Sequence, residues 1–134
     1  MTWGEVGQLA GRWIAAGTAN DEHAVERLLL RVSESGELSG LVDDGDGVFE
    51  RGSDCRIENS SSWVMASGIP CVAFDQIYSD DGSTTRWEAL YFVDTDTLEG
   101  SWSGDCCGSF VAIRQPHAPR EQDGKQRSQP MAFP

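Results

Sequence analysis

Hydrophobic and polar residues alternate along most of residues 9–114, in short runs that are separated by turn residues. Alternation with a period of two is typical of strands with one buried face, and no stretch shows a sustained helical period. The runs predict strands at residues 12–16, 25–32, 38–42, 72–78, 86–93, 98–103 and 109–114, with weaker ones within 48–57 and at 63–66. Ahead of them, Thr2 and Glu5 have the spacing of a capping box and predict a single helical turn.

An apolar–glycine–apolar phrase recurs three times, as "LAGRW" at residues 9–13, "LSGLV" at 38–42 and "LEGSW" at 98–102. Alternation places the three glycines on the inward face, where a glycine leaves room for a neighbouring aromatic ring and lets the strand bend. We therefore expect a strongly curved sheet. About eight antiparallel strands with short connections predict a single all-β domain, an up-and-down β-barrel without exposed edges, with a β-sandwich as the alternative.

Turn residues predict the registers of two hairpins. A three-residue loop at 34–36, with Gly36 at positive φ, would place six residues on one face: Leu28, Leu30, Val32, Leu38, Gly40 and Val42. Further along, Asp81-Gly82 favours a tight type I′ turn, which sets Gln76 beside Trp87.

On the outer face of the same hairpin this register sets Asp75 beside Glu88, a pair of like charges that only water tolerates. A loop at 94–97 then sets Tyr91 beside Gly100 in the next hairpin. The last strand has apolar residues on both faces, so its register stays open. The resulting inward set is Phe74, Gln76, Tyr78, Trp87 and Tyr91.

The segment Gly11-Arg12-Trp13, together with Arg114 in the last predicted strand, resembles the calycin group of small barrels, the lipocalins and the avidin family. The resemblance implies a barrel over residues 9–114 in which the basic residue lies across the tryptophan in a cation–π contact. The chain departs from avidin-like proteins after Trp13, because "IAAGTAN" replaces their polar, biotin-binding run. The resemblance therefore implies a shape and no particular ligand.

Charge and composition narrow the partners. Twenty-two acidic residues against ten basic ones give a net charge of −12, which disfavours nucleic acid and anionic membranes. No run reaches the ~20 apolar residues of a membrane span, and the N-terminus lacks signal-peptide features. We expect a soluble, cytoplasmic protein, or a secreted one if a leader has been removed. Residues 1–114 would form the barrel domain, and residues 115–134, rich in polar residues and proline, a flexible tail.

The interior of an eight-stranded barrel is either filled by side chains or holds one small ligand. The leading hypothesis is binding of a small hydrophobic or aromatic molecule, without cofactor or metal. Its candidate ligand contacts are five inward side chains: Gln76, Tyr78, Trp87, Tyr91 and Trp102. A packed aromatic core, with Gln76 and Tyr78 near a wet rim, is the alternative interpretation of the same residues.

Two other functions stay open. A non-catalytic protein-interaction module would dock on a partner through its C-terminal tail or an acidic rim. The acidic residues collect at "DDGDG" (43–47), "SDDGS" (79–83) and "DTDT" (94–97), where turn residues are the simpler interpretation. A barrel cyclase or isomerase would work by shape, with Tyr78, Tyr91 or Asp75 as acid or base. No catalytic motif is present, and His23 and His117 are expected in solvent, so a non-enzymatic role is the first expectation.

The four cysteines, Cys55, Cys71, Cys106 and Cys107, have neither CxxC nor zinc-ribbon spacing. Unpaired thiols are the expectation. In an oxidising compartment, Cys55 would pair with Cys106 or Cys107, because all three are expected at the same rim.

Overall fold

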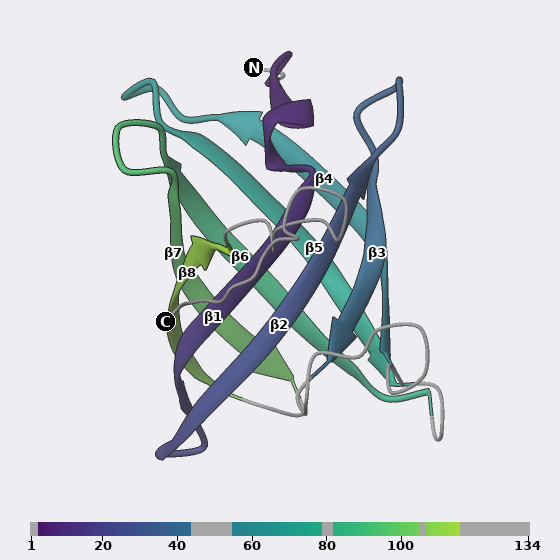
Figure 1. The fold of residues 1–134 in the computed structure, drawn as a ribbon, viewed down its shortest axis with the longest axis vertical. Coiled ribbons are helices and arrows are strands. Elements are labelled where there is room, and N and C mark those ends of the chain that lie inside the picture. The colour runs from purple at the N-terminus through teal and green to yellow at the C-terminus, as the bar shows by residue number, and fades with distance from the viewer. Residues whose placement is uncertain (1–2, 44–54, 79–81, 105–106, 116–134) are drawn as a thin grey trace, which may run out of the picture.

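The computed structural model describes residues 3–43, 55–78, 82–104 and 107–115 and shows a closed barrel of eight antiparallel strands (Figure 1). Each strand pairs with the strands before and after it, and β1 pairs with β8 to close the ring. The strands are β1 (Gly11–Ala19), β2 (Glu22–Val32), β3 (Leu38–Asp43), β4 (Cys55–Val64), β5 (Pro70–Tyr78), β6 (Thr84–Phe92), β7 (Thr97–Gly104) and β8 (Gly108–Arg114). The predicted up-and-down barrel is confirmed and the β-sandwich is wrong. Of the predicted tail, residues 116–134 lie outside the described residues.

The two ends of the barrel differ. A short 3-10 helix, η1 (Val6–Leu9), lies across the end where β2–β3, β4–β5 and β6–β7 are connected, which we call the plugged end (Figure 1). The other four connections lie at the opposite end, which we call the cavity end. Residues 44–54, 79–81 and 105–106, which include most of two acidic clusters, lie outside the described residues. The acidic cluster at residues 94–97 lies in the β6–β7 connection, at the plugged end.

Apolar side chains before β1 fill the plugged end. Trp3, Val6 and Leu9 are buried, and the ring of Trp3 lies 5.5 Å from that of Tyr91, centroid to centroid. Trp13, which is fully buried, donates from Nε1 to the carbonyl of Leu9 at 2.9 Å. The segment therefore forms a floor for the core.

The predicted helical turn is confirmed as η1, but its capping box is not. Glu5 occupies the N-cap position and makes no side-chain capping bond, and Thr2 lies outside the described residues.

Arg114 fastens this end. Its guanidinium lies 4.3 Å from the centre of the Trp13 ring, so the cation–π contact that the calycin resemblance implied is confirmed. The same group donates to the backbone carbonyls of Gln8 and Ala10 at 2.7 and 2.8 Å and to the carboxylate of Asp96 at 2.8 Å. One side chain thus joins β8, the segment before β1 and the β6–β7 loop.

We expect the acid sensitivity of the fold to depend on Asp96. The hydrogen bond from Arg114 lowers the pKa of this carboxyl, against the opposing effect of burial. A carboxyl whose pKa is lowered by folding stabilises the folded state at pH values above its ordinary pKa of about 4. This stabilisation is lost as the pH falls through the pKa of the folded state. Asp96→Asn should therefore make the melting temperature vary less with pH between about 5 and 2 than in the wild type. Thermal melts followed by circular dichroism test this, with Asp94→Asn, an exposed neighbour in the same loop, as the control. An equal effect of both substitutions would contradict the role of Asp96.

The β2–β3 hairpin has the predicted register. Val32 pairs with Leu38, and the loop closes with a hydrogen bond from the Ser33 amide to the Glu37 carbonyl at 2.9 Å. Gly36 takes the positive φ that the loop needs, at 91°.

The registers of the next two hairpins differ from prediction by two residues. Gln76 pairs with Thr85, and Trp87 pairs with Trp102. Because side chains alternate with a period of two, a shift of two preserves the faces, and Trp87 and Trp102 are buried as predicted.

The outer face of the β5–β6 hairpin shows what the predicted register missed. Asp75 pairs with Arg86 instead of Glu88, and their side chains form an ion pair at 3.1 Å. The turn is also longer than two residues, since the Tyr78 amide donates to the Ser83 carbonyl.

The two weak strands predicted within residues 48–66 are one strand, β4, interrupted by a bulge. The register with β5 shifts between Glu58 and Ser61, where Asn59 has a φ of 57°. The polar run "ENSSS" hides the alternation at this point. A bulge bends and twists a strand, so it helps to close the barrel.

The recurrent glycines allow neighbouring backbones to approach closely. A Cβ atom on Gly40 or Gly100 would lie 1.8 Å from the carbonyl oxygen of Leu29 or Glu88, on the adjacent strand. The expected curvature is present in the closed barrel, but the space next to Gly40 and Gly100 is occupied by backbone and not by the aromatic ring that was predicted.

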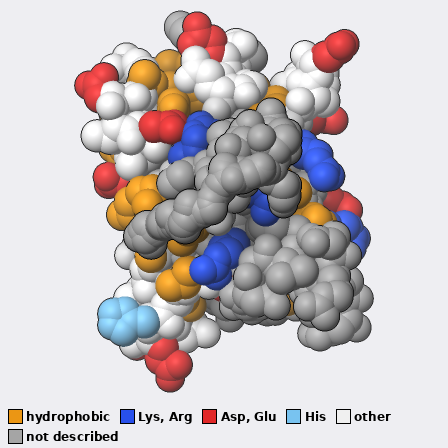
Figure 2. Space-filling view, viewed as in Figure 1, with side chains coloured by type: hydrophobic (Ala, Val, Ile, Leu, Met, Phe, Trp, Pro, Cys, Tyr) orange, Lys and Arg blue, Asp and Glu red, His pale blue; other side chains and the backbone are white. Residues whose placement is uncertain are grey.

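The two faces of β8 are now distinct. Phe110 and Ala112 are buried in the core, whereas Val111 and Ile113 are 46% and 52% exposed. Beside β1, at the left of the view, Figure 2 shows hydrophobic side chains reaching the surface. His23 is exposed as expected, and His117 lies outside the described residues. Among the described residues, no helix is long and apolar enough to cross a bilayer.

Candidate functional site

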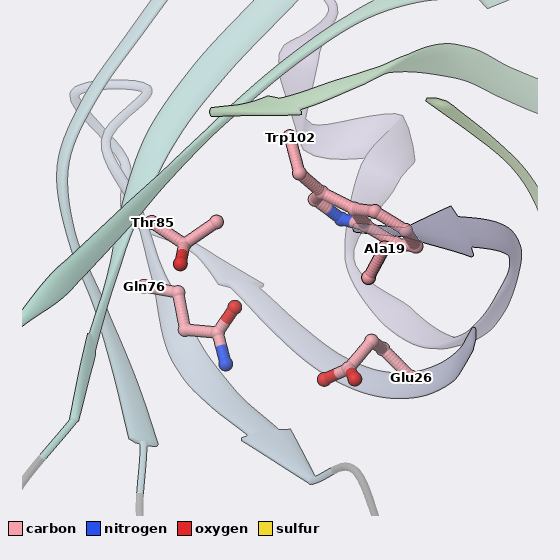
Figure 3. A pocket seen from close by; sticks show the side chains of 5 residues that line it. All are labelled: Ala19, Glu26, Gln76, Thr85 and Trp102. Atoms are coloured by element: carbon pink, nitrogen blue, oxygen red, sulfur yellow. The ribbon is translucent and has the colours of Figure 1, made fainter. Parts of the chain in front are cut away.

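A small pocket lies inside the barrel near the cavity end. Its walls come from five strands, β1, β2, β5, β6 and β7, whose side chains converge on one space (Figure 3). The lining residues are Ala19, Glu26, Gln76, Thr85 and Trp102. The cavity volume is about 10 Å³, which is room for about one water molecule.

Strand alternation and register bring these side chains together. Gln76 on β5 is directly paired with Thr85 on β6. Trp102 on β7 is paired with Trp87, the next inward residue of β6 after Thr85. The inward residues of β2 are Val32, Leu30 and Leu28, counted from the plugged end. Glu26 occupies the next inward position toward the cavity end. Along the barrel axis, these polar side chains therefore lie between the apolar core and the cavity end.

Two hydrogen bonds hold the Gln76 side chain in one orientation. Its oxygen accepts from Trp87 Nε1 at 2.9 Å, and its nitrogen donates to the sulfur of Cys55 at 3.3 Å. Because an indole nitrogen only donates, the bond from Trp87 identifies which end of the amide is the oxygen. Gln76 is 3% exposed, so its geometry is set by the core rather than by solvent.

Two other polar atoms of the pocket have no such partner. Thr85 and Trp102 are 1% and 4% exposed. Within the described part of the chain, neither Thr85 Oγ1 nor Trp102 Nε1 makes a hydrogen bond. A buried donor or acceptor left unpaired costs about 1–3 kcal/mol, so each of these atoms favours a bound molecule that pairs with it.

Aromatic rings fill the barrel directly behind the pocket. The ring of Trp87 lies 5.4 Å from Phe74, 5.4 Å from Trp102 and 4.9 Å from Phe110, centroid to centroid. Such contacts add to the burial of large apolar surfaces and make a dense core. A molecule that enters from the cavity end therefore meets this aromatic layer after it has reached the polar atoms.

The five predicted ligand contacts do not form one site. Gln76 and Trp102 line the pocket, and Trp87 supports it through its bond to Gln76. Tyr78 is half-buried and packs against the core cluster, but it is not among the pocket's lining residues. Tyr91 lies at the plugged end, where its hydroxyl donates to Asp96 at 2.7 Å.

Sequence reasoning missed Ala19, Glu26 and Thr85. Thr85 was on the predicted inward face of β6, but it is small and drew no attention beside Trp87. Glu26 had a usable signal, because it has the same parity as the inward residues Leu28 and Leu30. Burying a carboxylate at an inward position of a strand costs free energy unless the group is paired or hydrogen-bonded. The alternation of β2 therefore indicated that Glu26 was unusual.

The residues considered for catalysis lie apart from one another. Asp75 is on the outer face, paired with Arg86, and Tyr91 is at the plugged end. Burial and the bond to Asp96 raise the pKa of Tyr91, which makes it a poorer acid. Among the described residues, His, Cys, Asp and Glu side chains form no cluster that could hold a metal ion.

Three of the four cysteines are described, and no two of them form a disulfide with each other. Cys55 and Cys71 are buried and Cys107 is exposed, whereas Cys106 lies outside the described residues. The bridge considered between Cys55 and Cys107 is not formed. Burial raises the pKa of the Cys71 thiol, which lowers its reactivity.

Comparisons with known proteins give little further information. No family model matches the chain, and no curated protein matches it. Among solved structures, crystal structures of the fluorescent protein UnaG and of a mutant of it align with TM-scores of 0.44 and 0.46. Both are 10% identical and cover 82% of this chain and 99% and 98% of their own. Similarity at this level carries no information about a ligand.

Proposed function

We propose that this protein binds a small, largely apolar or aromatic molecule at the cavity end of its barrel. The observation that supports this function is the pair of unpartnered atoms, Thr85 Oγ1 and Trp102 Nε1, which are buried beside the same space. A site that combines an apolar surround with a few convergent polar groups is typical of small-molecule pockets.

The filled interior indicates how the molecule would bind. Phe74, Trp87 and Phe110 leave no room behind the pocket, so the ligand would enter end-on. Its polar end would occupy the small cavity beside Thr85 and Trp102. Its apolar body would lie closer to the open end of the barrel, near Ala19. On this proposal the barrel holds a small molecule in its interior, as the calycin resemblance implied.

A titration with coumarin, a neutral bicyclic aromatic lactone, tests the proposal. We expect saturable quenching of tryptophan fluorescence. Trp102→Phe should weaken binding roughly tenfold, because it removes one buried hydrogen bond and keeps an aromatic ring. Further neutral bicyclic lactones and ketones would extend the same test.

Trp63→Phe provides the matched control. Trp63 is 37% exposed on the outer surface, so the same chemical change there should leave the affinity as it is. Quenching that disappears in Trp63→Phe and persists in Trp102→Phe would place the ligand outside the barrel. Absence of saturable binding across the panel would favour the protein-interaction module instead.

A further inference from the structure

The pocket also restricts the chemistry of what it binds. We infer that the bound end of the ligand is an uncharged hydrogen-bond acceptor, a carbonyl or hydroxyl oxygen, and not a carboxylate. This inference rests on the proposed function, because it names the class of ligand for the same site.

Trp102 requires a hydrogen-bond acceptor. An indole N–H donates a hydrogen bond and cannot accept one, so its partner must carry a lone pair. An ammonium group has only donors and would leave Trp102 Nε1 unpaired. A carbonyl or hydroxyl oxygen in the same place would accept from the indole.

Thr85 is compatible with the same oxygen. A hydroxyl can donate or accept, and its hydrogen rotates to suit the partner. A carbonyl oxygen has two lone pairs, so it could accept from Trp102 Nε1 and from Thr85 Oγ1 together, as the two residues line one space. Neutral oxygens at the bound end of the ligand could thus pair with both of the unpartnered atoms.

Glu26 disfavours anionic groups. Figure 3 shows its carboxylate extending from β2 toward the centre of the pocket, on the side opposite Thr85. Glu26 has interactions of its own, and an ionised carboxylate repels an anion whether or not its oxygens are already bonded. None of the described residues that line the pocket is a lysine, arginine or histidine that would offset a second negative charge. Like charges within a few ångströms repel strongly where water is scarce, and the net charge of −12 acts in the same direction.

Two isosteric probes separate charge from shape. 2-Naphthamide and 2-naphthoate have the same ring and nearly the same outline, but at pH 7 only the second is charged. We expect the amide to bind the full-length, ¹⁵N-labelled protein at least tenfold more tightly. It should also shift the indole N–H resonance of Trp102, which Trp102→Phe assigns, while the resonance of the outer Trp63 stays in place.

Two variants identify the groups responsible. Glu26→Gln should narrow the difference between the probes, mainly through tighter binding of 2-naphthoate. Thr85→Val, which keeps the shape of the side chain and removes its hydroxyl, should weaken 2-naphthamide severalfold and leave the folded spectrum intact.

The outcomes distinguish the inference from the proposed function. Equal or tighter binding of 2-naphthoate to the wild type would overturn the inference and leave small-molecule binding standing. Binding of 2-naphthamide without movement of the Trp102 resonance would overturn it as well. If neither probe binds at millimolar concentration and the coumarin panel also fails, the proposed function itself falls.

Discussion

Gly100→Ala is expected to lower the free energy of unfolding by about 3 kcal/mol or more, and the melting temperature by about 10 °C or more. The added Cβ would lie 1.8 Å from the Glu88 carbonyl oxygen and 2.7 Å from the Cα of Ala89. Both atoms belong to the backbone of β6, so no side-chain rotation can relieve the clash. Either the β6–β7 pairing opens at this point or the strands move apart. Urea and thermal unfolding followed by tryptophan fluorescence measure the effect.

Gly7→Ala is the matched control, because a Cβ at that position would have nothing within 4 Å. We expect its stability to stay within about 0.5 kcal/mol of the wild type. If Gly100→Ala does not accumulate as folded protein at ordinary temperature, expression of the same variant at low temperature should allow hydrogen exchange to show the loss in β6 and β7. Wild-type stability of Gly100→Ala would mean that the two strands are not this close.

The faces of the strands were more predictable than their registers. The β2–β3 hairpin was predicted fully, because a short loop containing Gly36 sets both the turn and the pairing. In the next hairpin the Asp81-Gly82 pair indicated a turn that was too short, and the register slipped by two residues. The slip left the inward set intact, because only a shift by an odd number of residues turns side chains to the other face.

Contacts between distant segments decide what local patterns leave open. The observed register places Trp87 opposite Trp102 and lets Asp75 form its ion pair with Arg86. Neither gain is visible within a single hairpin turn. The bulge in β4 is of the same kind, since the Ser60 hydroxyl there accepts from the amide of Leu38, 22 residues away in sequence.

The pocket was predictable only in part for the same reason. Alternation identified Gln76 and Trp102 as inward residues, but it gave no position along the barrel axis. Tyr91 has the same parity as Trp87 on β6 and yet lies at the plugged end, where it donates to Asp96, which also accepts from Arg114. Assigning residues to one end of a barrel requires the pairings of all eight strands at once.

The second large effect is expected for Arg114→Met, which should cost about 2–4 kcal/mol of stability. Methionine keeps an unbranched apolar stem over Trp13 but loses the guanidinium, its cation–π contact and its bonds to Gln8, Ala10 and Asp96. Because Arg114 joins β8 to the segment before β1, the loss would be greatest where the barrel closes. Hydrogen exchange should show the largest increase at the amide of Gln115, which is bonded to the carbonyl of Arg12 at 2.8 Å.

Arg56→Met separates this role from the general effect of removing an arginine. Arg56 pairs with Glu58 on the surface of β4, with both side chains about half exposed. Exposed ion pairs contribute about 0–1 kcal/mol, so this variant should unfold close to the wild type. Equal losses from both substitutions would show that Arg114 acts only as one more surface charge. A selective loss in Arg114→Met, with coumarin binding at the opposite end retained in the folded fraction, would show that closing the barrel and binding the ligand are performed by separate ends of the same ring.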